Sequence, residues 1–300
     1  MKKSIVAVLF AWFMLSLLFS GCSSAAATDA VAPSTATAAP VQAASPTEAP
    51  EPTLASTPTD APPQPCMIAF DSDRDGNREV YLMGPDGAGL VNLSNDPAED
   101  RNPSWAPDGS QIAFVSNREN GEEGGQFIYV MGADGRNVRP LTVENGSDWP
   151  SWSPDGSQIA YAAGGDIFVI NADGSGSSTN LTNSEEKDIR PDWSPDSRQI
   201  VWLSGSEGNW NIFVMNADGS NVRQLTEDGK VSDAVWTVDG QIFTYWDHPE
   251  AGCFNCVMNA DGSNVMDAGG KGEIQRYLPF WTADGNRVEL NAADVLTGDN

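Results

Sequence analysis

The sequence has little positive charge. It contains 16 Lys and Arg residues against 42 Asp and Glu residues, so its formal net charge is −26. Nucleic acids and anionic membrane surfaces repel such a chain, which makes both of them poor partners. An excess of carboxylates is typical of a protein kept soluble outside the cytoplasm.

The sequence also has little of what hydrolytic enzymes need. His248 is the single histidine, and no Gly-x-Ser-x-Gly turn accompanies it, so a serine triad is not supported. A His-Glu-x-x-His zinc site and a glycine-rich phosphate loop are both absent from the sequence. Paired carboxylates for glycoside chemistry stay open, because 42 acidic residues give many accidental pairs.

Only one long apolar run is present, and it lies at the start of the chain. Lys2 and Lys3 precede the apolar run Ile5 to Phe19, a pattern typical of a secretory signal and short for a spanning helix. The run ends in Leu-Phe-Ser-Gly-Cys22, which resembles the bacterial lipobox, although Phe19 stands where leucine is usual. We therefore expect a signal over residues 1–22 and lipidation of Cys22; an ordinary signal with an incidental cysteine is the alternative. Two or more acyl chains would hold the protein at a membrane.

The next segment, residues 23–65, lacks large apolar side chains. It consists almost wholly of Ala, Thr, Ser and Pro with scattered acidic residues. Such a composition cannot bury enough surface to fold, and its prolines favour an extended spacer. We expect a disordered linker, which serves as a stalk or is filler without a required length.

From residue 66 onward the sequence is periodic. Tryptophans followed by x-x-Asp recur at Trp105, Trp152, Trp193, Trp236 and Trp281, separated by 47, 41, 43 and 45 residues. A second Asp-Gly turn recurs between them, and alternating apolar segments flank both turns. Four short strands per repeat of this length are typical of a β-propeller, in which stacked blades bury each other's faces.

The repeat resembles a known family. Its pattern is Pro-x-Trp-Ser-Pro-Asp-Gly-x-x-Ile-Ala-Phe, then Ile-Tyr-Val-Met-Asn-Ala-Asp-Gly, then Leu-Thr, which is similar to the TolB-like, WD40-like (PD40) propeller repeat. The resemblance covers residues 66–291 and leaves a tail at 292–300. It implies an all-β, extracytoplasmic propeller, commonly six-bladed, that binds protein or assists a hydrolase. The sequence supplies about five blades, and ring closure would place Leu278 to Trp281 beside Ile68 to Phe70.

Strand order predicts two different faces. The tight Asp-Gly turns share one face, and loops of variable length and chemistry share the other, where binding sites usually lie. Charged and aromatic residues precede the tryptophans on that second face. The candidate partner-binding residues are Asp100, Arg101, Asp148, Trp149, Asp188, Arg190, Arg276 and Tyr277. The three aspartates could line a funnel for a basic peptide or a cation, or they could only cap loop backbone.

One acidic segment resembles the first half of a calcium loop. Asp71, Asp73 and Asp75 alternate and are followed by Gly76, as in an EF-hand loop. The twelfth position is Leu82, where a bidentate glutamate would be needed. The segment also falls where a plain strand turn is expected. Calcium is therefore a weak hypothesis, and no other cofactor is expected.

Three cysteines remain besides Cys22. Cys253-Phe-Asn-Cys256 could be a redox motif, half of a zinc site or a short disulfide. Zinc lacks a second ligand pair, and a redox enzyme would need a βαβ context. Cys66 and Cys253 should lie at opposite ends of a blade, on the order of 15 Å apart by strand rise. We predict a bond between Cys253 and Cys256, with Cys66 unpaired.

The function we expect is a membrane-anchored, non-catalytic binding module of the cell envelope, whose partner is an envelope protein or peptide. The alternatives are an accessory propeller of an envelope hydrolase and a stand-alone enzyme acting on glycans or peptides. Fold alone does not decide between them.

Overall fold

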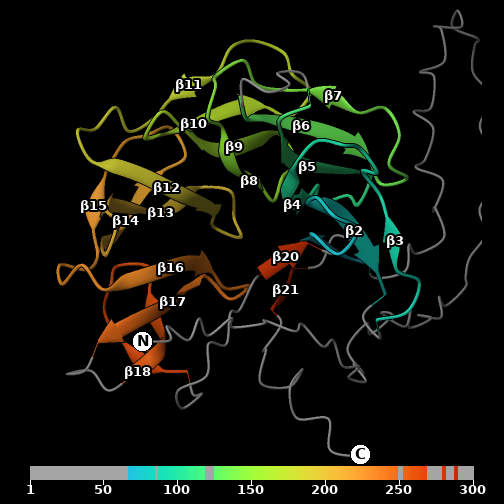
Figure 1. Ribbon diagram of the computed structural model, residues 1–300. Coiled ribbons are helices and arrows are strands. Elements are labelled where there is room, and N and C mark those ends of the chain that lie inside the picture. Colours follow the sequence, from blue (N-terminus) through green and yellow to red (C-terminus); the bar gives the residue numbers. More distant parts are fainter. Residues whose placement is uncertain are drawn as a thin grey trace, which may run out of the picture. The chain divides into compact units, whose positions relative to one another are not determined.

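The computed structural model of the chain is built from β-strands (Figure 1). It describes residues 67–84, 87–118, 125–248, 253–268, 279–281 and 287–289. All of them belong to the larger of the two units into which the chain divides. The predicted signal, linker, lipidated Cys22 and C-terminal tail lie outside the described residues. Within the described ranges, no helix has the length and apolar character needed to cross a membrane.

The strands form six antiparallel sheets in chain order, which we call blades 1 to 6. Blade 1 has three strands: β1 (Ile68–Ser72), β2 (Glu79–Met83) and β3 (Val91–Asn92). Blade 2 has four: β4 (Asp100–Trp105), β5 (Gln111–Ser116), β6 (Phe127–Gly132) and β7 (Arg139–Pro140). Blade 3 has β8 (Asp148–Trp152), β9 (Gln158–Ala163), β10 (Asp166–Asn171) and β11 (Thr179–Asn180).

Blades 4 and 5 repeat this order, and blade 6 is shorter. Blade 4 has β12 (Lys187–Trp193), β13 (Gln199–Ser206), β14 (Asn209–Asn216) and β15 (Arg223–Gln224). Blade 5 has β16 (Val231–Trp236), β17 (Gln241–His248), β18 (Cys253–Asn259) and β19 (Met266–Asp267). Blade 6 has β20 (Pro279–Trp281) and β21 (Arg287–Glu289). The predicted four-stranded repeat is thus confirmed in blades 2 to 5.

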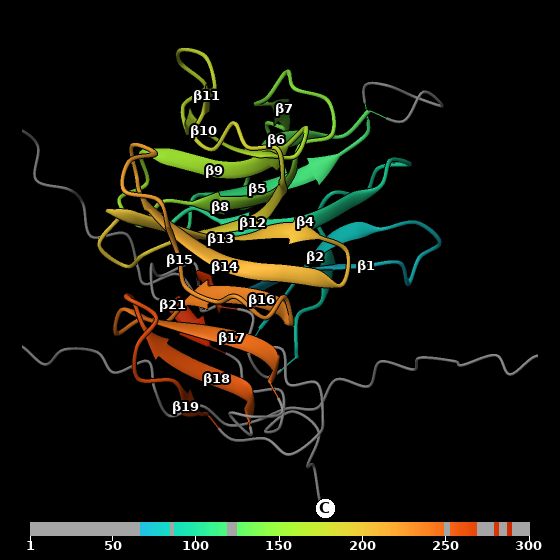
Figure 2. The same ribbon diagram turned by 90° about the vertical axis from the view of Figure 1, so that its left-hand side faces the viewer.

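The core lies between the blades. Each of four apolar clusters joins two consecutive blades, which lie one against the next in Figure 2. Trp105 packs with Val80 and Leu82 of the preceding blade, and Trp193 packs with Ala160 in the same way. The tryptophans that end β4, β8, β12 and β16 are at most 3% exposed. Burial of each such ring stabilises the stack by about 2–3 kcal/mol.

Closure of the blades differs from the expectation. Among the described strands β1 pairs only with β2, whereas β20 pairs with β21 and lies beside β4. The expected seat of Pro279–Trp281 beside Ile68–Phe70 is therefore wrong for the described residues. The closing contact depends on which strands of the two chain ends meet, and no local sequence signal specifies that.

The Asp-Gly turns are stabilised by their own side chains. In the turn after β8, Gly156 N–H donates to the Ser153 carbonyl, and Asp155 Oδ1 accepts from Ser157 N–H at 2.9 Å. The turns after the third strands use the same bond. It joins Asp173 to Ser175, Asp218 to Ser220 and Asp261 to Ser263 at 2.7 to 2.9 Å. The predicted turn geometry is confirmed.

These turns predict how stability depends on pH. The hydroxyl and N–H groups of the following serines hold the pKa values of Asp173, Asp218 and Asp261 below their ordinary value. A carboxyl whose pKa is lower in the folded state contributes stability above its unfolded pKa and loses it on acidification. We expect the free energy of unfolding to fall below about pH 4. Urea unfolding of Asp218→Asn should show a smaller drop between pH 6 and pH 3.5 than the unchanged chain; an equal drop would contradict this account.

The β13–β14 hairpin predicts a stability difference between two glycines. A Cβ added at Gly205 would lie 2.1 Å from the backbone oxygen of Asn209, whereas one at Gly208 would meet nothing within 4 Å. Both residues have positive φ, so either substitution strains the backbone. The steric clash should make Gly205→Ala the more costly change by about 1–3 kcal/mol. Equal urea midpoints for the two variants would show that the hairpin backbone relaxes around the added Cβ without loss of stability, and would contradict the prediction.

Candidate functional site

The innermost strands share an irregular feature at the end opposite the tight turns. We call this the entry end and define it as residues 100–102, 147–149, 188–190 and 231–233. The pairing register of each innermost strand shifts there. Asn102, Trp149 and Arg190, each three residues before a tryptophan, have positive φ of 52°, 49° and 56°. Such strained backbone persists only where surrounding contacts fix it, and it is concentrated at functional sites.

Asp148 joins blade 3 to blade 2 at the entry end. Its Oδ2 accepts from Arg101 Nη2 at 2.7 Å and its Oδ1 accepts from Asn102 Nδ2 at 2.7 Å. Arg101 Nη2 also donates to Gln126 Oε1 at 2.7 Å. The Asp148 side chain is 11% exposed and that of Arg101 is 23% exposed, so this ion pair is largely screened from water. Both charges are therefore neutralised within the protein.

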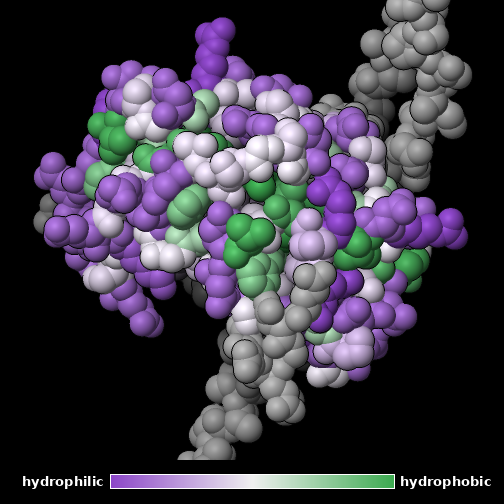
Figure 3. Space-filling model, turned by 90° about the horizontal axis from the view of Figure 1, so that it is seen from above, coloured by the Kyte–Doolittle hydropathy of each residue, from purple (hydrophilic) through white to green (hydrophobic). Residues whose placement is uncertain are grey.

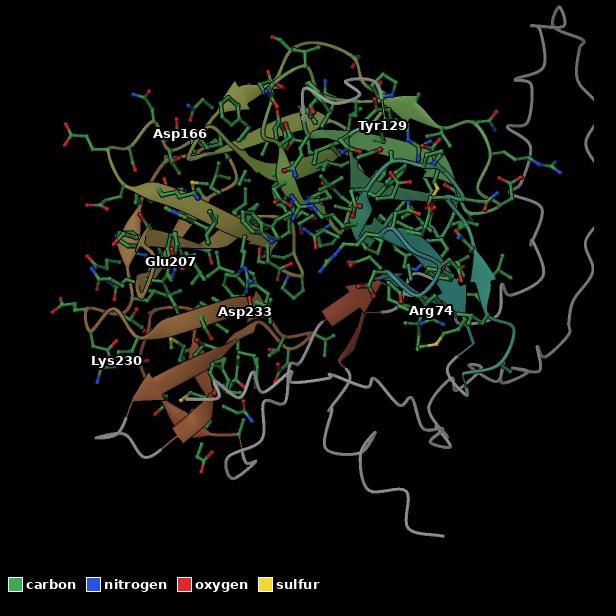
Figure 4. All side chains as sticks on the ribbon, viewed as in Figure 1. Arg74, Tyr129, Asp166, Glu207, Lys230 and Asp233 are labelled. Atoms are coloured by element: carbon green, nitrogen blue, oxygen red, sulfur yellow. The ribbon has the colours of Figure 1, made fainter. Side chains whose placement is uncertain are left out.

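Arg190 continues the contacts from blade 3 to blade 5. Its guanidinium lies 5.9 Å from the centroid of a Trp149 ring. Arg190 Nη1 donates to the Ser232 carbonyl at 2.9 Å and lies 3.5 Å from Asp233 Oδ2. Asp233 lies on β16 (Figure 4). Unlike Arg101, the Arg190 side chain is 35% exposed. It is the accessible cation of this network.

Asp100 is an internal group. It is fully buried, and its Oδ2 accepts from Arg118 Nη2 at 2.6 Å. Burial raises the pKa of Asp100, while the Ser116 hydroxyl and the charge of Arg118 act against that rise. Arg118 in turn lies over the rings of Phe114 and Tyr129, 5.3 and 5.5 Å from their centroids. Asp100 therefore anchors Arg118 and offers no free carboxylate.

The predicted funnel of three carboxylates is not formed. Asp100 and Asp188 stand five residues before their tryptophans and lie opposite Ser116 and Ser204, whereas Asp148 stands four residues before its own. Side chains alternate between the faces of a sheet, so the odd residue places Asp148 on the other face. Asp188 is buried as well. Arg276 and Tyr277 lie outside the described residues.

The calcium hypothesis is not supported by the arrangement of its carboxylates. Asp71 accepts from Asn102 N–H at 3.1 Å and pairs with Arg78, and Asp75 accepts from the Tyr81 hydroxyl at 2.5 Å. The described residues contain no group of three or more His, Cys, Asp or Glu that could hold a metal ion. Asp71 and Asp75 are thus bound by different protein donors.

The cysteine prediction is tested in part. Cys256 is disulfide-bonded and fully buried in β18. The side chains of Cys253 and Cys66 lie outside the described residues, so the bond between Cys253 and Cys256 stays a prediction.

Several contacts of the entry end were missed by the sequence interpretation. Arg118, Asn102 and Asp233 were not singled out, although each binds a predicted residue. Asn102 and Asp233 could have been found by counting back three residues from each tryptophan, which also selects Trp149 and Arg190. Nothing in the sequence shows that Arg118 folds back onto Asp100.

Comparison with known proteins decides the family. A model of the TolB beta propeller domain (PD40) matches residues 52–166 and 150–275. The chain belongs to the TolB beta propeller domain family. A TolB homolog from Chlorobium luteolum (strain DSM 273 / BCRC 81028 / 2530) is 37% identical over 175 residues, 57% of this chain. The match spans only 39% of the length of that relative.

Solved structures agree on the propeller fold. A structure assigned as TolB from Agrobacterium tumefaciens has a TM-score of 0.55 and 25% identity, covering 67% of this chain and 79% of the other. An oligogalacturonate lyase in complex with manganese has a TM-score of 0.50 and 13% identity, covering 78% and 67%. The second likeness shows the fold alone, and a shared fold does not imply a shared activity.

The buried pair of blade 2 predicts a stability effect. Asp100→Asn removes the charge that Arg118 binds and leaves that guanidinium beside a neutral amide. We expect a loss of about 3 kcal/mol in the free energy of unfolding, measured by urea titration. Arg118→Leu in the same chain should cost less than it does alone, because the two changes remove one interaction. Additive losses would show that the contact carries no stability.

Proposed function

We propose that this chain is an extracytoplasmic TolB-type propeller, anchored to a bacterial membrane through Cys22, that binds an envelope protein or peptide at its entry end without catalysis. The TolB relatives support the family part of this proposal. The signal pattern and lipobox resemblance of residues 1–22 support the anchor. The linker at 23–65 would separate the propeller from the membrane surface.

The pair Trp149 and Arg190 carries the proposal. Both residues are held in left-handed backbone, which costs on the order of 1–2 kcal/mol each in a non-glycine residue. They stack across the boundary of blades 3 and 4, and Arg190 stays partly exposed. Trp and Arg are the residues most enriched in the energetic centres of protein interfaces. Trp149 is partly buried against two apolar clusters, which hold it in place, and Arg190 is 35% exposed beside it on the face of variable loops. This strained, partly accessible pair fits a rigidly held binding site.

The surface of the propeller is otherwise polar. On the face seen in Figure 3, polar residues predominate, and apolar residues gather near its centre and at a few places along its edge. The exposed large apolar side chains of the described residues are scattered over several blades, among them Leu90, Val143, Val222, Val238 and Met266. Scattered residues of this kind do not mark an interface. A partner would thus be recognised by specific polar and aromatic contacts, helped by long-range attraction of basic surfaces to a chain of charge −26.

The test is capture of partners from envelope extract with the purified full chain. Replacing Trp149 and Arg190 by alanine should remove the captured protein, because both removed side chains belong to the proposed contact. The control is Arg198→Ala, since Arg198 is also an arginine of blade 4 but lies 83% exposed beside a tight turn on the opposite face. Equal capture by both variants would reject the entry end as the binding site.

A further inference from the structure

Blades 1 to 4 repeat one pair of aromatic rings on adjacent strands, which are β1 and β2 in blade 1 and the second and third strands in blades 2 to 4. The pairs are Phe70–Tyr81, Phe114–Tyr129, Tyr161–Phe168 and Trp202–Phe213, with ring centroids 5.6 to 6.0 Å apart. Because the four pairs occupy equivalent positions, the blades can be compared with one another to see which side chains lie over such a pair.

In blade 2 a guanidinium lies over the pair. Arg118 lies over Phe114 and Tyr129, its Nε donates to Ser116 Oγ at 3.0 Å, and its Nη2 donates to Asp100 at 2.6 Å. Rings, hydroxyl and carboxylate together complete one cation site. Each of the three components favours a planar cation with several N–H donors.

Blade 1 contains the cation but lacks the carboxylate. Arg74 lies 5.1 and 4.7 Å from the centroids of Phe70 and Tyr81, and its Nε donates to Ser72 Oγ at 3.0 Å. The sheet has no strand on the inner side of β1 among the described residues, so no equivalent of Asp100 faces Arg74. The arginine therefore takes the same pose in two blades, which shows that rings and hydroxyl suffice to position it.

Blade 4 contains the carboxylate but lacks the cation. Asp188 lies opposite Ser204 on β13, as Asp100 lies opposite Ser116, and the Trp202–Phe213 pair lies at the equivalent position. The residue at the place of Arg118 is Ser206, which is exposed at the end of β13. The other three components are present.

Asp188 has an unpaired oxygen on its buried side chain. The residue is 1% exposed, and its Oδ1 has no hydrogen-bond partner among the described residues. Asp100 Oδ1 is unpaired in the same way, but Asp100 Oδ2 accepts from Arg118, whereas no described arginine is paired with Asp188. A buried polar group without a partner costs about 1–3 kcal/mol, and an absent ligand is a standard cause of such an orphan.

The other blades show that the fold does not require an acid at this position. Blade 3 has Ser147, whose hydroxyl donates to the Glu144 carbonyl at 2.6 Å, and blade 5 has Val231, which is buried in an apolar cluster. Neither Ser147 nor Val231 places a buried polar side-chain atom without a hydrogen bond at this position. Asp188 is therefore a costly choice where serine or valine would serve the packing.

We propose that Asp188, Ser204 and the Trp202–Phe213 pair form a receptor site for the arginine side chain of a binding partner. The proposal deepens the proposed function by naming a chemical feature of the partner. The route is given by Arg118, whose side chain starts two residues after Ser116 and reaches Asp100. A partner's arginine would enter beside Ser206, next to Glu207 in the β13–β14 turn (Figure 4). A metal ion fits less well, since aromatic faces take a guanidinium and supply no oxygen ligands.

The test uses the full chain and N-acetyl-arginine amide as the probe. We expect a saturable shift of the Trp202 indole N–H resonance in NMR spectra, identified by its loss in Trp202→Phe. The neutral N-acetyl-citrulline amide should bind about tenfold more weakly, because it lacks the charge-assisted bond to Asp188. Asp188→Val, which copies blade 5, should abolish the shift. Asp239→Asn removes an exposed charge at a tight turn on the opposite face and should leave it unchanged.

A second variant keeps the test decisive if Asp188→Val fails to fold. Ser206→Arg should fill the site from within the chain, abolish the probe shift and raise the melting temperature. A shift that survives in Asp188→Val or in Ser206→Arg, or equal binding of the citrulline probe, would overturn the proposal. The two proposals fail separately. Capture of a partner without any probe shift removes the arginine site alone, and a probe shift without any captured partner leaves the site and removes the envelope-binding function.

Discussion

The packing of each blade against the one before it is the interaction on which the rest of this structure depends. A four-stranded sheet cannot cover its own two faces, so every blade needs a neighbour on each side. The tryptophan that ends each innermost strand in blades 2 to 5 is buried in that contact, as Trp105 is against Val80 and Leu82. Its position fixes the register of the strand, and the tight turn that follows fixes where the next strand begins. The regular face of the propeller is a consequence of this requirement.

At the entry end of the innermost strands, neighbouring blades are joined by polar contacts. Asp71 with Asn102, Asp148 with Arg101, and Arg190 with Ser232 each cross one boundary between blades. Such contacts depend on the identity of single residues, so they can vary from blade to blade without loss of the stack. In blades 2 to 4 the strained backbone at Asn102, Trp149 and Arg190 accompanies these contacts. Residue types therefore differ most between blades at positions where a change does not disturb the packing of the stack.

The blades and their tight turns could be predicted from the sequence because each depends on local sequence signals that repeat along the chain. Spacing of tryptophans, Asp-Gly turns and alternating apolar strands each depend on neighbours a few residues away, and all three agreed. The site could be predicted only in part. Arg190 and Trp149 were found by their residue types, but the partners of Asp100 and Asp148 come from other strands, and no local signal shows which arginine reaches which carboxylate. The closure at β20 failed for the same reason, since it depends on contacts between the two ends of the propeller.

Repetition also separates structural from functional residues without any comparison to other proteins. A residue required by packing should recur in every blade, whereas a residue that costs stability should recur only where something compensates for it. Asp100 meets that condition through Arg118, and Ser147 and Val231 avoid the cost altogether. Asp188 alone among the four equivalent residues of blades 2 to 5 is a buried acid without compensation in the described part of the chain. In the proposed arginine site, a partner's guanidinium would supply that compensation.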